Sequence, residues 1–216
     1  MTDASIEPPE DQLGLERIVF FSDAVMAIAI TLLAIDLRVP EIAPASAAQQ
    51  LAASLAAIRP RFMTFFISFL VIAIYWVSHH RYFRYIKRYD TRLMWLNMMF
   101  LFFIICMPFL ASLLGEYVFV PLALIAYTLA IAALGVALAL IWWYASAGHR
   151  LIAQDLDAAT IRTINVRLWS APVMFLVAVP FAYVGGTAVI IVWWLSPLVV
   201  LAAMRLWGGS KRAGRK

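Results

Sequence analysis

Long apolar stretches separated by short polar segments dominate this chain. A helix needs roughly 20 apolar residues to cross the hydrocarbon core of a bilayer, and six stretches meet or approach that length. These six predicted spans cover residues 18–37, 62–80, 93–114, 117–145, 168–185 and 187–207. Gly185 and Gly186 separate the last two and can take the positive φ of a tight hairpin. The pattern predicts an all-α integral membrane protein with a multi-pass topology.

A further helix is predicted outside the membrane, between the first two spans. Pro40 and Pro44 open this segment, and the Ala-rich run of residues 46–58 follows them. We expect this run to form a short helix on the outer surface. Its apolar face would lie in the membrane interface or pack on a neighbouring chain.

The composition agrees with a membrane protein. The chain has 216 residues, of which 65% are hydrophobic and 13% charged, whereas a soluble domain is nearer half apolar. The acidic, proline-containing N-terminus is unlike a basic secretory signal peptide, so the first stretch is expected to be a true span. We divide the chain into an acidic polar tail (1–14), one six-helix transmembrane domain (15–207) and a basic tail (208–216).

Lysine and arginine concentrate on one side of the predicted membrane. The chain has 17 of these residues, and only Arg38, Arg59 and Arg61 fall on the other side. The positive-inside rule therefore places both termini in the cytoplasm, as an even number of spans also requires. The basic loops and tail also suit anionic lipid headgroups, although a topology signal alone is the simpler explanation. They do not indicate nucleic-acid binding.

The first span carries polar side chains that a lipid-facing helix would do better without. Ser22 and Asp23 lie about one and a half turns in, Thr31 lies near the middle, and Asp36 lies near the far end. An aspartate at the centre of a span costs on the order of 2.5–3.5 kcal/mol on insertion scales. Such residues are expected to face protein or water.

The predicted topology brings several polar and aromatic residues to one depth in the inner leaflet. The first span begins there, the second ends there and the third begins there. The residues in this layer are Arg17, Ser22, Asp23, Trp76, His79, His80 and Asn97. They hold enough donors and acceptors to satisfy one another. We favour a helix-packing role over contact with a substrate, and the sequence does not decide which histidine takes part.

A helical wheel separates a second group of residues on the first span. The members of one stripe are Ala24, Ile28, Thr31, Leu32 and Ile35. At 100° per residue, Ile28 lies about 140° from Asp23. If the Asp23 side packs within the subunit, this stripe faces either lipid or a pore formed by several chains. In a pore, the aliphatic side chains of the several copies would form a hydrophobic constriction around the axis. The Thr31 hydroxyls would replace part of an ion's hydration shell.

The sequence lacks the usual motifs of catalysis and metal binding. It has no Gly-rich phosphate loop and no nucleophile motif, so no enzyme activity is expected. The adjacent histidines of "SHHR" (78–81) point about 100° apart on a helix and rarely share one metal ion.

The start of the first span resembles the Arg-x-x-x-Phe-Ser-Asp signature of the transmembrane protein 175 family. This family comprises endolysosomal potassium channels and their prokaryotic relatives. The matching residues are Arg17, Phe21, Ser22 and Asp23. The stretches "AIAITLLAIDL", "YWVSHHRYF" and "LNMMFLFFIICMPFL" are also similar, so the likeness covers essentially the whole chain.

The resemblance implies a potassium-selective cation channel in the cell membrane that lacks the TVGYG filter. It implies a homotetramer of single-repeat chains, with the first helix lining a pore on the symmetry axis. It places the constriction at Ile28, a hydroxyl layer at Thr31, and further layers at Leu32 and Ile35. Permeant K⁺ and other monovalent cations would pass near Ile28 and Thr31, and no cofactor is implied. Asp36 either concentrates cations at the outer mouth or is a solvated helix end.

Other functions remain open at this point. A proton-coupled secondary transporter would use Asp23 with His79 or His80 as a relay, but no inverted repeat or matched pair of broken helices is evident. A membrane-embedded enzyme built on the same residues lacks a nucleophile–base arrangement. A purely structural membrane protein stays possible until conduction is measured.

Overall fold

The computed structural model describes residues 10–193 and residue 195, and all regular secondary structure within them is helical. The long helices are α1 (Glu10–Leu33), α3 (Arg59–Phe83), α4 (Thr91–Glu116), α5 (Pro121–Ser146) and α6 (Ala158–Ala178). The shorter elements are α2 (Ala47–Ala57) and the 3₁₀ turns η1 (Ala34–Asp36), η2 (Pro44–Ser46), η3 (Ala147–His149) and η4 (Val179–Tyr183).

Five segments within the described residues are long and apolar enough to cross a membrane. They are Asp11–Asp36, Arg59–Phe83, Thr91–Glu116, Pro121–His149 and Ala158–Tyr183. These five correspond to the first five predicted spans. The chain is helical again over 186–193, but most of the sixth predicted span, 187–207, lies outside the described residues, as does the basic tail 208–216. The sixth span therefore stays a prediction.

Two helices begin well before the apolar stretches that predicted them. α1 starts at Glu10, inside the predicted polar tail, and α6 starts at Ala158, whereas its predicted span starts at 168. Asp157 caps α6, because its carboxylate accepts a hydrogen bond from the backbone N–H of Thr160 at 2.8 Å. Apolar patterning indicates which residues lie in the hydrocarbon core, whereas the cap at Asp157 sets where α6 starts.

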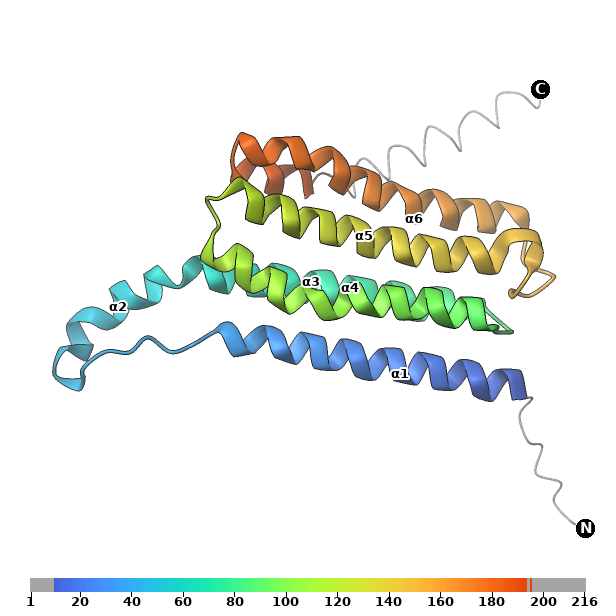
Figure 1. The fold of residues 1–216 in the computed structure, drawn as a ribbon, viewed down its shortest axis with the longest axis horizontal. Helices are drawn as coiled ribbons and strands as arrows, with labels where there is room; N and C mark the ends of the chain where they lie inside the picture. Colours follow the sequence, from blue (N-terminus) through green and yellow to red (C-terminus); the bar gives the residue numbers. More distant parts are fainter. Residues whose placement is uncertain (1–9, 194, 196–216) are drawn as a thin grey trace, which may run out of the picture.

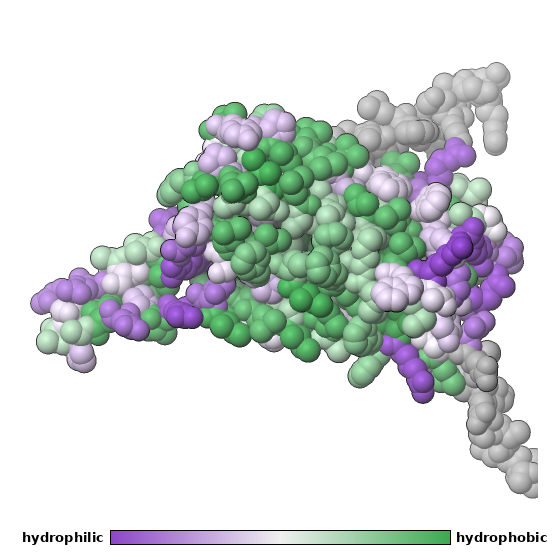
Figure 2. All heavy atoms as spheres, in the orientation of Figure 1, coloured by the Kyte–Doolittle hydropathy of each residue, from purple (hydrophilic) through white to green (hydrophobic). Residues whose placement is uncertain are grey.

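The long helices run side by side in layers. Figure 1 shows α1 at one edge of the stack, α3 and α4 next to it, then α5 and finally α6. α5 is the most enclosed helix, and its Tyr127, Ile131 and Trp142 are fully buried. Gly135 lets α3 and α5 approach closely, since a Cβ there would meet the Tyr75 hydroxyl at 2.9 Å. Figure 2 shows apolar side chains over the middle of the bundle and polar ones toward both ends.

The segments that follow α3 and α5 meet at one end of the bundle. The backbone N–H groups of Lys87 and Arg88 donate to the carbonyl of Leu151 at 2.8 and 3.2 Å. Ile86 and Ile152 form an isolated antiparallel bridge beside them. These two basic segments therefore lie on the same side of the bundle, as the predicted topology requires.

The structure confirms the extra helix between the first two spans. η2 begins at Pro44, and α2 follows over Ala47–Ala57. No residue of α2 is buried, and the helix projects away from the stack (Figure 1). In the turn predicted between the last two spans, Gly185 has a φ of 138°, a backbone conformation that favours glycine.

Candidate functional site: the two faces of α1

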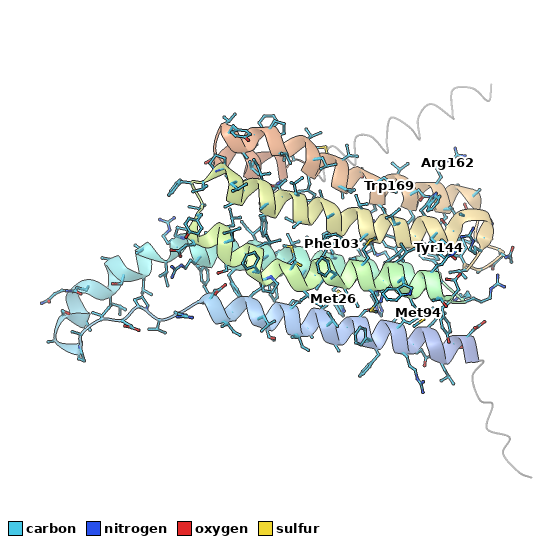
Figure 3. All side chains as sticks on the ribbon, in the orientation of Figure 1. Met26, Met94, Phe103, Tyr144, Arg162 and Trp169 are labelled. Atoms are coloured by element: carbon cyan, nitrogen blue, oxygen red, sulfur yellow. The ribbon has the colours of Figure 1, made fainter. Side chains whose placement is uncertain are left out.

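One face of α1 packs against α3 and α4. Its buried residues follow a spacing of three and four and are Leu15, Ile18, Ser22, Met26, Ala29 and Leu33. Met26 lies between α1 and the layer of α3 and α4 (Figure 3). Asp23 is only half-buried, and Ala27 beside it is exposed. The packed stripe is therefore centred on Ser22 rather than on Asp23, because α4 approaches α1 from that side.

Hydrogen bonds join α3, α4 and α1 in the buried layer. The Nε2 atom of His79 lies 2.9 Å from Oδ1 of Asn97. The amide of Asn97 donates to Oγ of Ser22 at 2.9 Å, and the hydroxyl of Ser22 donates to the carbonyl of Ile18 at 2.8 Å. Because the Asn97 amide donates to Ser22, its oxygen accepts, so Nε2 of His79 carries the proton. The donors therefore run in one direction, from α3 through α4 to α1, and the last bond closes within α1.

Asp23 has a separate partner. Its Oδ1 accepts a hydrogen bond from the indole N–H of Trp76 on α3 at 2.8 Å. We call Ser22, Asp23, Trp76, His79 and Asn97 the inner polar cluster. The cluster fastens α1 to both of its neighbours at adjacent positions, which fixes the rotation of α1 about its own axis.

The two histidines occupy different environments. His79 is fully buried, and its ring stacks between those of Phe83 and Phe100, with centroids 4.1 and 5.3 Å away. His80 is exposed and lies beside the Trp76 ring at 6.2 Å. Within the described residues, His79 is thus the histidine that hydrogen-bonds within the inner polar cluster.

Two residues of the signature stay outside this cluster. Arg17 and Phe21 are both exposed on α1, and Phe21 keeps 49% of its surface accessible. Within the part of the chain that is described, Arg17 forms no ion pair. In the described part of the chain, these two side chains therefore take no part in the hydrogen bonds that hold α1 on α3 and α4.

The opposite face of α1 has no cover from its own chain. Ile28, Leu32 and Ile35 expose 58%, 41% and 64% of their surfaces. Thr31 is also exposed, and its hydroxyl donates to the carbonyl of Ile28 at 2.8 Å. Since the hydroxyl proton is engaged with the backbone, the lone pairs of the oxygen remain available to accept a hydrogen bond or to coordinate a cation. We call these four residues the exposed α1 stripe.

A polar cavity lies at the far end of α1 from Arg17. Its volume is about 190 Å³, and its charged lining residues are Asp36, Arg38, Arg61 and Glu116. Arg61 and Glu116 form an ion pair across α3 and α4. Asp36 is half-buried at this cavity. Among the described residues, no group of three or more histidine, cysteine or acidic side chains is placed to hold a metal ion.

Two polar contacts lie deeper in the bundle and were not predicted from the sequence. The Oγ of Ser68 and the hydroxyl of Tyr127 lie 2.7 Å apart, and the hydroxyl of Tyr75 donates to the carbonyl of Ile131 at 3.2 Å. Both contacts join α3 to α5. The signal was present in the pattern, because Ser68 and Tyr75 are polar positions seven residues apart and therefore share one face of α3.

Comparisons with known proteins agree on one family. The family model described as "Endosomal/lysosomal potassium channel TMEM175" matches residues 17–108. A potassium channel of Streptomyces collinus is 34% identical over 174 residues, which cover 79% of this chain and 83% of the relative. The crystal structure of a lysosomal potassium-selective channel TMEM175 homolog from Chamaesiphon minutus matches with a TM-score of 0.74 and 26% identity, over 88% of this chain and 97% of that one.

A human relative differs in name and in length. The human endosomal/lysosomal proton channel TMEM175 is 25% identical over 205 residues. This match covers 89% of the present chain but only 40% of the human protein.

Proposed function

Because this chain belongs to the TMEM175 family of membrane channels, we propose that it is a potassium-selective channel that conducts K⁺ passively across a membrane. The Streptomyces relative named as a potassium channel is matched over most of its length, which supports the same activity here. The apolar lengths of the helices support placement in a membrane, and the cell membrane is the proposed one.

The exposed α1 stripe is the observation that carries the proposal. α1 lies at the edge of the bundle, packed on one side and uncovered on the other (Figure 1). Four copies related by a central axis would turn the exposed α1 stripe of each chain toward that axis. The match to most of the Streptomyces channel, but to less than half of the human protein, supports a single-repeat chain that needs several copies to build a pore.

The pore would combine an apolar constriction with an oxygen layer. A ring of Ile28 side chains would narrow the path and make it costly for water to fill. Thr31 oxygens, one turn away, would offer partial coordination to a K⁺ ion that has lost part of its hydration shell. Asp36 at the outer end would raise the local concentration of cations. With the basic loops in the cytoplasm and six spans, both termini would be cytoplasmic.

The inner polar cluster would keep the exposed α1 stripe aimed at the axis. Ser22 and Asp23 are held from α4 and α3, so α1 cannot rotate without breaking hydrogen bonds in an apolar layer. An unsatisfied polar group in the hydrocarbon region costs several kcal/mol. This is a large part of a typical free energy of unfolding, which is about 5–15 kcal/mol.

A proton relay through Asp23 gains no support from the geometry. Asp23 is bonded to the indole N–H of Trp76, which is a donor only and cannot accept a proton. His79 leads instead through Asn97 to Ser22. Within the described residues, no hydrogen-bonded path links Asp23 to either histidine.

The proposal is tested by reconstitution in a planar bilayer with K⁺ on one side and Na⁺ on the other. We expect unitary currents whose reversal potential lies toward the K⁺ equilibrium potential. A saturating flux that follows an imposed proton gradient, without unitary currents, would favour a carrier instead.

A further inference from the structure

Six cations gather where the segments after α3 and α5 meet, and the proposed pore does not use them. We call Arg81, Arg84, Lys87, Arg88, Arg92 and Arg150 the basic loop surface. All six side chains are exposed. Hydrophilic residues gather at this end of the molecule in Figure 2.

Hydrogen bonds hold the two segments in a fixed arrangement. Besides the two backbone bonds to Leu151, the guanidinium of Arg88 donates to the carbonyl of Arg150 at 3.0 Å. The guanidinium of Arg150 also lies over the ring of Tyr144, 4.5 Å from its centroid. The spacing of these cations is therefore set by the fold, which a topology signal alone would not require.

Asp90 and Asp157, two carboxylates at this end, accept hydrogen bonds from groups other than these cations. Asp90, the one acidic residue between Arg81 and Arg92, accepts from the Tyr144 hydroxyl at 2.6 Å and from the backbone N–H of Leu93 at 2.8 Å. Asp157 in the other loop accepts from Thr160. Within the described residues, no member of the basic loop surface forms an ion pair with a carboxylate.

Exposed tryptophans mark the depth of this surface. Trp95 and Trp143 expose 71% and 55% of their surfaces, and each lies a few residues from the loops along α4 or α5. Tryptophan is enriched at the level of lipid headgroups. The basic loop surface therefore lies at the level of the lipid phosphates.

We propose that the basic loop surface binds the phosphate groups of anionic membrane lipids. Clusters of four to eight cations beside a span attract such lipids, and arginine forks match phosphate oxygens in geometry. The proposal rests on insertion in a membrane and does not depend on the ion that the pore conducts.

Bound lipid would also restrain the pore-lining helix. The ring of Tyr89, in the same segment, packs directly on Gly14 in α1, so that a Cβ on Gly14 would overlap it. Lipid bound at the basic loop surface would therefore lie next to a segment that packs on the start of α1, one turn before Arg17.

The test measures thermal unfolding of the full chain in detergent with added phosphatidylglycerol or phosphatidylcholine. We expect the wild type to bind phosphatidylglycerol more tightly. The double variant Arg84→Gln/Lys87→Gln should lose about 25-fold of that preference, since each cation near the surface contributes roughly fivefold. The matched control, Arg38→Gln/Arg59→Gln, removes two cations from the opposite end and should keep the preference.

Three results would overturn the proposal: an unchanged preference in the Arg84/Lys87 variant, an equal loss in the control, or equal stabilisation by inorganic phosphate at the same concentration. If the double variant does not fold, the charge-preserving pair Arg84→Lys/Lys87→Arg must retain the preference, and salt at about 0.5 M must weaken it in the wild type. Normal K⁺ currents without a lipid preference would reject this inference and leave the channel intact.

Discussion

At the scale of single residues, the neighbours on α1 divide into two groups by the direction they face. Ser22 is fully buried and hydrogen-bonded, whereas Ile28, less than two turns away, exposes 58% of its surface. An exposed isoleucine is ordinary on a lipid-facing helix. On a helix whose other face is fastened by polar contacts, it becomes the side chain that a symmetric assembly would bring to its axis.

Replacing Ile28 by alanine should widen the constriction. We expect the Ile28→Ala variant to carry a larger single-channel current and to prefer K⁺ over Na⁺ less strongly, because the apolar ring that forces dehydration is removed. Planar-bilayer recordings measure both quantities. Ile74→Ala, which trims an exposed isoleucine on α3, serves as the control and should behave as the wild type. Identical conductance and ion preference in the two variants would move the constriction elsewhere.

At the scale of elements, α1 is secured mainly through its contacts with α3 and α4. Asn97 is central, since its amide joins His79 on α3 to Ser22 on α1. At the end of the bundle, Asp90 plays a similar part, because it caps α4 and accepts a hydrogen bond from Tyr144 on α5. Each residue joins helices that the sequence pattern alone would leave free to slide.

The Asn97→Ala variant should be less stable by about 1–3 kcal/mol, because it leaves buried donors and acceptors on His79 and Ser22 unpaired. Thermal unfolding in detergent measures the change. Gln50→Ala on the exposed α2 is the matched control and should have little effect. Wild-type stability combined with altered permeation would instead assign Asn97 to the ion path.

Acid should weaken the junction at Asp90. Desolvation raises the pKa of this carboxyl, but the hydrogen bonds from Tyr144 and the backbone and the charge of Arg150 outweigh it and hold the pKa below its ordinary value of 3.8. A lowered folded-state pKa stabilises the protein above the ordinary pKa, and this contribution is lost as the pH falls through the lowered value. The wild type should therefore lose more stability than Asp90→Asn when the pH falls below about 4. Equal acid sensitivity of the two melting curves would contradict this.

At the scale of the whole molecule, the layered bundle leaves α1 at its edge. Its centre is α5, and α6 covers the side away from α1 (Figure 1). α1 carries the exposed α1 stripe at this edge, and we expect this face to contact other copies of the chain. In the proposed tetramer, the neighbouring chains would cover the exposed face of α1 and complete the wall of the pore.

The purified protein should have a mass near four times the 24.2 kDa of one chain. Light scattering with a correction for bound detergent, or native mass spectrometry, measures it. A stable monomer that still conducts K⁺ would show that the pore lies within one bundle. The Asn97→Ala variant should yield less tetramer than the wild type, because α1 is then less firmly oriented.

The sequence by itself determined the membrane class, the first five spans, the α2 helix and the shared end of the two basic segments. These follow from apolar length and charge, which act locally. It also identified the residues of α1 that carry polar groups. It could not choose between His79 and His80, because adjacent side chains on a helix point in different directions and only the position of α4 decides which one is enclosed.

Only the tertiary structure decided that the packed stripe centres on Ser22, that Trp76 rather than a histidine holds Asp23, and that Leu151 joins the two basic loops. Each of these is a contact between segments far apart in the chain. The helical wheel supplies the angles between residues of α1. The packing of α3 and α4 decides which of those residues face the bundle and which face away from it.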